Sequence, residues 1–421
     1  MRRAAAWSTR IPGGPDGRRM LWIALMDRIG SGLWASVSVL YFTYVTGLSV
    51  AQIGTLVAAA GAVGIAGAPL GGRIADRLPL THVLIALQLL RALASFALLT
   101  TDNYALLLVF SAAGSFGDRA ANVLTKLYAT RVAGPDRVRY QAVTRTVANA
   151  GWAVGGLVAA AALTIGTTAA YQWLLAGDAV SFAAVALATA RCGEPPSATR
   201  TIATSKDPVP ATRPASPWRD RTYLAYVATE TVLFLDDAVF KVGLPLWIAH
   251  SDHAPHGLAP LLMVLNNVMV VTLQVPLARF GATTAAARAL LMPLSAVFAL
   301  GGATMALSAT GGAVAVTLFL TMAAAAFTVA EMLHATVSWE LSVALAPETA
   351  QGTYLGVHGL AQAAQRSVGP LAVTAAIAAG PPGWTLFGTF IALTCVFQHR
   401  IVRDRLNRPA MSVPPVTVSE H

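Results

Sequence analysis

Four charged side chains inside one apolar stretch place the strongest constraint on how this chain can fold. Residues 223–248 read YLAYVATETVLFLDDAVFKVGLPLWI, which is long and apolar enough to cross a bilayer. The stretch nevertheless contains Glu230, Asp236, Asp237 and Lys241. A charge near the middle of a membrane costs about 3 kcal/mol, whereas each Leu, Ile, Phe or Val returns only about 0.5 kcal/mol. Lipid therefore cannot surround this segment on all sides.

The spacing of these residues indicates where the charges point. On a regular helix Glu230, Phe234, Asp237 and Lys241 follow one another at steps of four, three and four, and so share one face. Asp236 points about 100° away from Asp237. Lys241 is either a substrate ligand or simply the ion-pair partner of Asp237 one turn away. We expect a helix bundle in which this face lines a polar, water-accessible centre.

The composition of the whole chain is that of a helical membrane protein. Of its 421 residues, 56% are hydrophobic and only 11% are charged, whereas soluble domains have about 25% charged residues. Long apolar runs without alternation exclude a transmembrane barrel. The net charge of +10 does not indicate nucleic-acid binding, because the basic residues lie between apolar spans. Cys192 and Cys395 are too few for a disulfide framework or a zinc site.

Twelve apolar spans follow one another along the chain. We expect them at about 20–45, 51–72, 79–100, 103–125, 141–164, 169–191, 222–249, 257–279, 285–307, 311–334, 352–378 and 383–402. A Pro-rich, basic segment at 193–220 cannot bury a core and predicts a cytoplasmic linker. The predicted fold is an all-α membrane protein with twelve transmembrane helices in two pseudo-symmetric six-helix bundles. The bundles would comprise residues 1–192, with a cytoplasmic N-terminal tail, and residues 221–402, followed by a cytoplasmic tail at 403–421.

The basic residues of the connections indicate the orientation of the spans. The connections expected on the outer side contain no Lys or Arg; they lie near residues 46–50, 101–102, 165–168, 250–256, 308–310 and 379–382. Nearly all the alternate connections and the C-terminal tail carry basic residues, as the positive-inside rule requires of cytoplasmic segments. The connection at 340–348 is the exception, because it has acids and no bases. We expect a multi-pass protein of the cell membrane with both termini in the cytoplasm.

Several predicted helices carry polar side chains on one face. These stripes comprise Asp27, Ser31, Trp34, Ser38 and Tyr41; Ser111, Ser115, Asp118, Asn122 and Thr125, with Arg119 beside them; Arg145, Asn149 and Trp152; Phe327, Glu331, His334 and Ser338; and Tyr354, His358, Gln362 and Gln365. The third, sixth, ninth and twelfth spans are almost wholly apolar through their middles. We therefore expect the polar groups on the first, fourth, seventh and tenth spans.

These polar groups have two interpretations. Ionisable groups at membrane depth usually mark a transport route, which favours a functional role for the acids. Ser, Thr and Asn can instead simply join helices, and this interpretation applies to Ser111, Ser115 and Asn122. His334, three residues after Glu331, is either a proton relay or a packed neutral histidine.

A short motif between the second and third spans resembles a family signature. Residues 72–77 read Gly-Arg-Ile-Ala-Asp-Arg. With twelve spans in two halves, this resembles the major facilitator superfamily and its Gly-x-Leu-Ala-Asp-Arg loop signature. Residues 242–248 and Asn266-Asn267 are similar to segments of actinobacterial members of this family. The spacing of the small residues Gly151, Gly155 and Gly156 is similar to that of the fifth-span motif of drug antiporters.

The resemblance implies a gate and an alternating-access mechanism. Gly72, Asp76 and Arg77 would form the gating loop, in which Asp76 caps a neighbouring helix and Arg77 binds a cytoplasmic carboxylate. Pro79, Leu80 and Thr81 stand where the family usually has a glycine and two basic residues, which implies a weaker latch. The two bundles would rock around a site near the middle of the membrane.

Within this mechanism the buried acids would couple substrate movement to protons. A carboxylate in an apolar cleft can bind and release protons during the cycle. The proton or cation sites we expect are Asp27 and Asp237, followed by Glu230, Glu331 and His334. The substrate cavity we expect is lined by Trp34, Tyr41, Arg119, Asn122, Trp152, Phe234, Lys241, His358 and Gln362. Its aromatic members suit an amphiphilic organic substrate.

Three classes of function are compatible with these features. The first is proton-coupled export of a drug-like or secondary-metabolite substrate; the second is a proton-coupled nutrient importer of the same fold. The third, a membrane-embedded enzyme or sensor, is disfavoured because the sequence has no nucleophile with a base at fixed spacing and no phosphate loop. We expect a monomer whose partners are a small molecule, protons and the bilayer, with no resident cofactor or metal.

Overall fold

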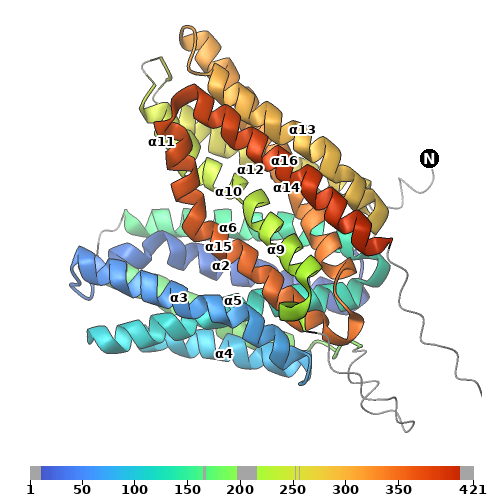
Figure 1. The fold of residues 1–421 in the computed structure, drawn as a ribbon. Coiled ribbons are helices and arrows are strands. Elements are labelled where there is room, and N and C mark those ends of the chain that lie inside the picture. The colour runs from blue at the N-terminus through green and yellow to red at the C-terminus, as the bar shows by residue number, and fades with distance from the viewer. Residues whose placement is uncertain (1–10, 165–166, 197–215, 252, 256, 408–421) are drawn as a thin grey trace, which may run out of the picture.

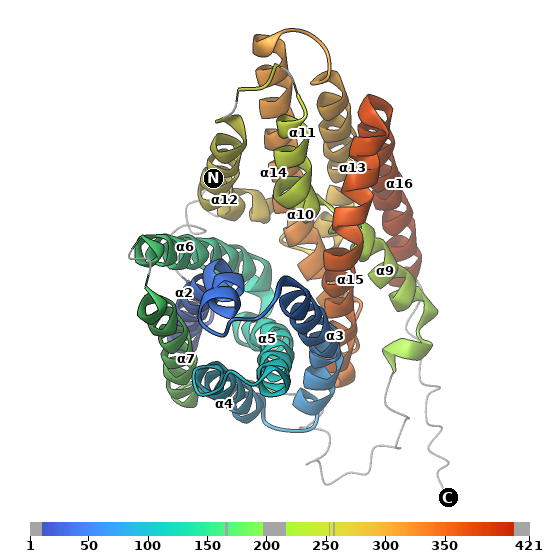
Figure 2. The same ribbon diagram turned by 90° about the vertical axis from the view of Figure 1, so that its left-hand side faces the viewer.

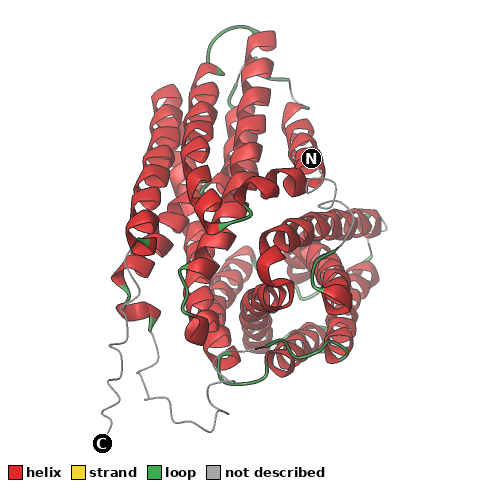
Figure 3. Cartoon of the chain, turned by 90° about the vertical axis from the view of Figure 1, so that its right-hand side faces the viewer, coloured by secondary structure: helices red, strands yellow, loops and turns green. Residues whose placement is uncertain are grey.

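The structure is a computed structural model that describes residues 11–164, 167–196, 216–251, 253–255 and 257–407. In these residues it contains helices joined by short loops and no strands (Figure 3). Most of the predicted linker and of the two terminal tails, namely residues 197–215, 1–10 and 408–421, lie outside the described residues.

The first half of the chain forms one six-helix bundle. Its helices are α2 (Gly14–Tyr44), α3 (Val50–Ala75), α4 (Leu80–Leu98), α5 (Tyr104–Ala133), α6 (Arg137–Leu163) and α7 (Thr168–Ala190), with a 3₁₀ turn, η1 (Gly134–Asp136), between α5 and α6. Helix α3 packs along α5, α2 packs against α6 and α7, and α4 lies against α5 and α7. Seen nearly end-on in Figure 2, the six helices form a ring.

The second half forms the other bundle. Its elements are η2 (Pro217–Arg219), α9 (Arg221–Leu233), α10 (Asp236–Ala238), η3 (Val239–Gly243), α11 (Leu244–Ala249), α12 (Leu258–Ala278), η4 (Arg279–Gly281), α13 (Thr284–Leu307), α14 (Ala313–Ala344), η5 (Glu348–Ala350), α15 (Gln351–Ala378) and α16 (Gly380–Leu406). Helix α13 packs against both α14 and α16. If α9–α11 are counted as one span, the described residues contain the twelve spans in two bundles that the sequence predicts.

Local sequence sets where these helices begin. Ser49 caps α3 by accepting the backbone N–H of Gln52, and the Gln52 side chain accepts the N–H of Ser49 in return. Asn103 caps α5 by accepting the N–H groups of Ala105 and Leu106. Because these caps satisfy amides that have no partner within the helix, each span begins at a defined residue.

The outer surface of the bundles suits lipid. Large apolar side chains are strongly exposed there, including Trp173 at 76%, Leu157 at 71% and Val314 at 85%. Within the described residues, seven helices are long and apolar enough to cross a membrane by length and composition alone: α3, α4, α7, α12, α13, α14 and α16. The remaining spans carry more charge, and each of them contributes side chains to the interface between the bundles. The more charged helices therefore face the space between the bundles, and single polar residues of the apolar helices also reach it.

The seventh span is broken, which differs from the continuous helix expected from the sequence. Helix α9 ends at Leu233, and a π-helical turn at Val239–Gly243 follows the short α10. The change of helical phase moves Glu230 and Asp237 to different surroundings. Glu230 is fully buried within the second bundle, whereas the side chain of Asp237 is 42% exposed. The prediction that Glu230, Asp237 and Lys241 share one face is therefore wrong.

The two bundles contact each other at one end of the molecule. We call this the terminal end; it holds the beginnings of α2, α9 and α15 and the ends of α3 and α16. There α3 packs along α15, and the beginning of α6 packs against the end of α12. Away from the terminal end the bundles diverge, so that the helices of one bundle run across those of the other (Figures 1 and 2).

Candidate transport site

Two adjoining cavities lie where the bundles face each other. Their volumes are about 310 and 640 Å³. Both take side chains from the two halves of the chain, and they share the lining residues Arg28, Arg91, Asp118, Asn122, Trp152 and Arg366. The shared lining makes them two parts of one polar region between the bundles.

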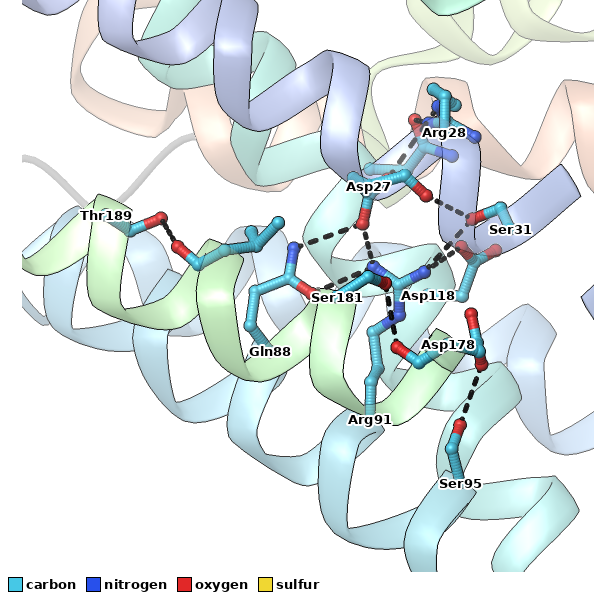
Figure 4. A network of polar contacts seen from close by, with 12 residues as sticks. Asp27, Arg28, Ser31, Gln88, Arg91, Ser95, Asp118, Asp178, Ser181 and Thr189 are labelled. Atoms are coloured by element: carbon cyan, nitrogen blue, oxygen red, sulfur yellow. Dashed lines mark hydrogen bonds and ion pairs between the residues drawn. The ribbon is translucent and has the colours of Figure 1, made fainter. Parts of the chain in front are cut away.

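A buried arginine organises the charge of the first bundle. Arg91 of α4, whose side chain is 4% exposed, donates to Asp27 of α2 at 2.5 Å and to Asp118 of α5 at 3.2 Å (Figure 4). It also donates to the Gln88 side-chain oxygen at 2.9 Å. Asp27 and Asp118 both line the first cavity. One cation thus holds two acids from different helices at the cavity wall.

Another acid lies close to this cluster. Asp178 of α7 is 1% exposed; one of its oxygens accepts a hydrogen bond from Ser95 at 2.9 Å, and the other has no hydrogen-bond partner among the described residues. The guanidinium of Arg91 also packs on the ring of Phe182, 3.8 Å from its centroid. Arg91 and Asp178 belong to the third and sixth spans, so the expectation that these spans carry no polar groups is wrong.

The second bundle buries an acid among hydrogen-bond donors. Glu230 of α9 accepts hydrogen bonds from Ser338 and from the side-chain amide of Gln398, the latter at 2.5 Å. The Nε2 atom of His358 lies 3.2 Å from the carboxylate. Ser338 and His358 also line the first cavity, so they connect the buried Glu230 to it.

A histidine joins Glu230 to a second buried acid. The Nε2 atom of His334 lies 3.4 Å from Glu230, and its Nδ1 atom lies 3.9 Å from Asp236. Phe234 packs edge-to-face on His334 and lines the first cavity. Asp236 is 2% exposed, and its Oδ2 atom has no hydrogen-bond partner among the described residues. Titratable groups thus extend from the cavity wall into the bundle.

The other predicted coupling acids occupy two different places. Asp237 binds Lys241 at 2.8 Å, and both residues line the second cavity. Glu331 lines neither cavity; it pairs with Arg145 of the opposite bundle and accepts a hydrogen bond from Asn266 at 2.9 Å. Glu331 therefore links the bundles, whereas Asp27 and Asp237 face the space between them.

Most of the side chains predicted to form a substrate cavity do line it. The lining includes Trp34, Arg119, Asn122, Trp152, Phe234, Lys241, His358 and Gln362. Tyr41 does not, because it is 2% exposed and its hydroxyl donates to the Leu98 carbonyl within the first bundle. Beyond Arg91, the residues that sequence analysis did not select include Lys126, Arg366 and Gln398. A lone ionisable group in an apolar span is the signal that could have found Arg91.

The predicted gating residues lie at the terminal end, against the other bundle. Asp76, at the end of α3, accepts the N–H groups of Gly352 and Thr353 at 2.9 and 2.7 Å and also the Thr353 hydroxyl. It therefore caps α15 from the other half of the chain. Gly72 packs so closely on α15 that an added Cβ would overlap the Gly352 carbonyl oxygen. Arg77 is exposed and pairs with no carboxylate among the described residues.

A further ion pair crosses the same end. Arg137, which begins α6, donates to both carboxylate oxygens of Glu340 on α14, at 2.7 and 2.8 Å. Glu340 is 2% exposed and also accepts the Thr284 hydroxyl. Two-pronged pairs of this kind fix orientation as well as distance, so they hold the bundles together at the terminal end.

Solved structures with this fold are membrane transporters. A bacterial homologue of the iron transporter ferroportin in an outward-facing state matches with a TM-score of 0.68 and 14% identity, over 93% of this chain and all of that one. FucP in the outward conformation matches with a TM-score of 0.64 and 15% identity, over 93% and 99% of the two chains. The proton:xylose symporter XylE matches with a TM-score of 0.61 and 14% identity, over 92% and 96%.

Sequence comparison gives a consistent result. Among curated protein sequences, none matches this chain. The sequence profile of the Major Facilitator Superfamily matches residues 20–370, which is most of the chain and covers parts of both bundles. The chain therefore belongs to the major facilitator superfamily and is a secondary transporter rather than an enzyme.

Proposed function

We propose that this chain is a monomer in the cell membrane that exports a small organic molecule in exchange for protons. The position of Asp27 carries the proposal: it lines the cavity between the bundles, is 8% exposed, and shares Arg91 with Asp118. A proton on Asp27 removes the charge that holds Arg91 there, which frees the guanidinium for Asp118. Proton binding in the cavity thereby changes the charge that a substrate meets.

A second proton site in the other bundle supports coupling. In the proposal a proton enters from the cavity at His358, reaches Glu230, and passes through His334 to Asp236. The distances that support this route are 3.2 Å for His358–Glu230, 3.4 Å for Glu230–His334 and 3.9 Å for His334–Asp236. Both bundles would then carry a group that responds to protons while they rock around the site between them.

The closed terminal end supports a cycle that begins open to the outside. If both termini are cytoplasmic, the contacts of Asp76 and Glu340 close the cytoplasmic side while the divergent ends face outward. Drug-antiporter character is supported by the small residues of α6. Gly151 and Gly155 pack so tightly on α2 that a Cβ at either position would overlap its backbone. This close contact couples the position of α2, which carries Asp27, to that of α6.

Everted membrane vesicles test this function. A growth-inhibition panel in a host without its own efflux pumps first identifies an exported compound. Vesicles should then accumulate that compound when a proton gradient is applied, and Asp27→Asn should abolish the gradient-driven component. The matched control is Asp404→Asn, since Asp404 is exposed at the end of α16 and, among the described residues, forms an ion pair only with its neighbour Arg403. Unaltered coupling in Asp27→Asn, Asp237→Asn and Glu230→Gln alike would contradict the proposal.

Import by proton symport uses the same fold and the same buried acids. Intact cells separate the two directions, because an exporter lowers the intracellular level of the compound when the cells are energised. Accumulation inside energised cells that Asp27→Asn abolishes would replace export with import and leave the proton sites in place.

A further inference from the structure

The region between the bundles holds more basic than acidic side chains. This excess is present in the lining of both cavities. The lining acids are already engaged: Asp27 and Asp118 share Arg91, Asp237 binds Lys241, and Asp178 accepts from Ser95. The remaining basic side chains therefore determine the charge that is open to a ligand.

Three cations in this region have no acidic partner. No carboxylate of the described residues lies within ion-pair distance of Arg119, Lys126 or Arg366, although all three line a cavity. Lys126 instead lies over the ring of Trp339, 5.9 Å from its centroid. Arg119 and Lys126 are half-buried, where an unpaired cation is costly, whereas Arg366 is exposed to the open cavity. An anion that binds a half-buried cation recovers part of that cost.

The three cations come from the two bundles and are divided between the cavities: Arg366 lines both, Arg119 lines the second and Lys126 lines the first. Arg119 and Lys126 are seven residues apart on α5, with Asn122 between them, and so share one helix face. Arg366 comes from α15, one turn after Gln362, which also lines the first cavity. An anion held by these groups would therefore touch both halves of the transporter.

The rest of the lining suits an apolar body. Trp34 and Trp152 line the second cavity, together with aliphatic side chains of α3. The planar guanidinium groups match carboxylate, sulfonate or phosphate oxygens in pairs, as an ammonium does not. We propose that the transported molecule is an amphiphilic organic anion whose acidic group binds Arg119 and Arg366 and whose apolar part lies against Trp34 and Trp152; all four residues line the second cavity.

This assignment rests on the proposed function for the role of the cavity, and it specifies the substrate class. Because Arg119 and Arg366 repel each other across the open cavity, a bound anion favours the approach of the two bundles. A cation of the same shape meets the like charges of Arg119 and Arg366 and is disfavoured. Charge selection and closure of the bundles then depend on the same side chains.

Three nitroaromatic probes that differ in charge test the assignment. 4-Nitrobenzoate, 4-nitrobenzamide and 4-nitrobenzylammonium are titrated into the purified full-length protein at one pH and ionic strength, with quenching of tryptophan fluorescence as the readout. Trp152, which is 43% exposed at the cavity wall, reports occupancy. We expect saturable quenching by the benzoate at a concentration about tenfold or more below that for the amide, and the weakest binding by the cation.

Variants assign the selectivity to Arg119 and Arg366. Arg119→Gln and Arg366→Gln should each weaken benzoate binding about tenfold and leave the amide unchanged, so that the amide confirms an intact cavity. Arg119→Lys and Arg366→Lys should retain the preference for the anion. The matched control is Arg400→Gln, since Arg400 is exposed on α16 away from both cavities.

Several outcomes would overturn the assignment. They are tighter binding of the cation, equal binding of the three probes, no saturable quenching by millimolar benzoate, or benzoate affinity that Arg119→Gln and Arg366→Gln leave unchanged. Because the titration uses no proton gradient, its result does not depend on proton coupling or on the direction of transport. If the titration shows a preference for the anion but proton coupling is unaltered in the acid variants, the proposed function is rejected and the substrate class is retained. If the titration shows a preference for the cation but vesicles show proton-driven export, the substrate class is rejected and the proposed function is retained.

Discussion

At the scale of single residues, Arg91 determines how the first bundle tolerates its acids. Its guanidinium contacts Asp27, Asp118 and the ring of Phe182, and its side chain is 4% exposed. Removing three charges from water is expensive, and the contacts offset that expense only when all partners are present. The arrangement is therefore stable as a group and sensitive to the loss of Arg91, the cation that contacts both acids, although Arg28 also lies 3.7 Å from Asp27.

We predict that Arg91→Leu strongly destabilises the protein. The substitution leaves two partly buried acids without their shared partner, which costs about 3–5 kcal/mol. Arg91→Lys should cost less, because lysine keeps the charge but cannot bind both acids in the same plane. Thermal unfolding of the detergent-purified variants measures the difference, with the exposed Arg221→Leu as control. Unfolding of Arg91→Leu at the wild-type temperature would contradict this account of the cluster.

Sequence reasoning located one part of this cluster and missed the other. Asp27 could be predicted because it lies at helical spacing from Ser31 and Trp34, on one amphipathic face. Arg91 has no such local pattern, and its partners lie 64 and 27 residues away along the chain. Contacts between helices depend on how the helices pack, and the residue periodicity of a single helix does not specify this packing.

At the scale of elements, the break in the seventh span places Glu230 and Asp237 in different surroundings. Pro245 has no N–H to donate to the carbonyl of Lys241, and its ring disfavours a regular helix there. The chain responds with a π-helical turn, in which the Leu244 N–H donates to the Val239 carbonyl. Pro245 accounts for a kink, but only the packed structure shows that the Glu230 side chain is buried within the second bundle while Asp237 lines the second cavity.

The beginning of α15 gives the element-scale prediction. Asp76 caps this helix from the opposite bundle, so Asp76→Ala should free the amides of Gly352 and Thr353. Losing a cap costs about 1 kcal/mol, and charged hydrogen bonds add to it, so exchange of these amides should accelerate about tenfold. Hydrogen–deuterium exchange of peptides that cover 350–355 measures the change.

The control for this prediction is another acid next to a helix. Asp136→Ala removes an exposed acid that immediately precedes α6 and makes no side-chain cap there, so it should leave exchange in α15 unchanged. Equal acceleration in both variants would mean that exchange reports general loosening of the terminal end rather than loss of the Asp76 cap.

At the scale of the whole molecule, contacts between the bundles explain the exception in the charge pattern. The sequence predicted two bundles and noted acids without bases near residues 340–348. The acid Glu340 in this connection binds Arg137 of the other half of the chain at the terminal end, which explains why an acid is present there. The twelve spans were predictable from hydropathy, since each reflects local composition. The pairing across 203 residues was not, because it depends on which faces the two bundles present to each other.

The close approach of α3 and α15 makes Gly72 the best position to test the closed end. Gly72→Ala places a Cβ against the Gly352 carbonyl, and neither backbone can yield without separating the bundles. Gly61→Ala on the same helix is the matched control, because a Cβ there meets no atom within 4 Å. Spin labels on the exposed Leu78 and Glu348, in a background without Cys192 and Cys395, report the separation by double electron–electron resonance. We expect a longer distance in Gly72→Ala, longer still in Gly72→Val, and no change in Gly61→Ala. If Gly72→Val retained the wild-type distance, steric contact between these helices would not limit how the bundles close.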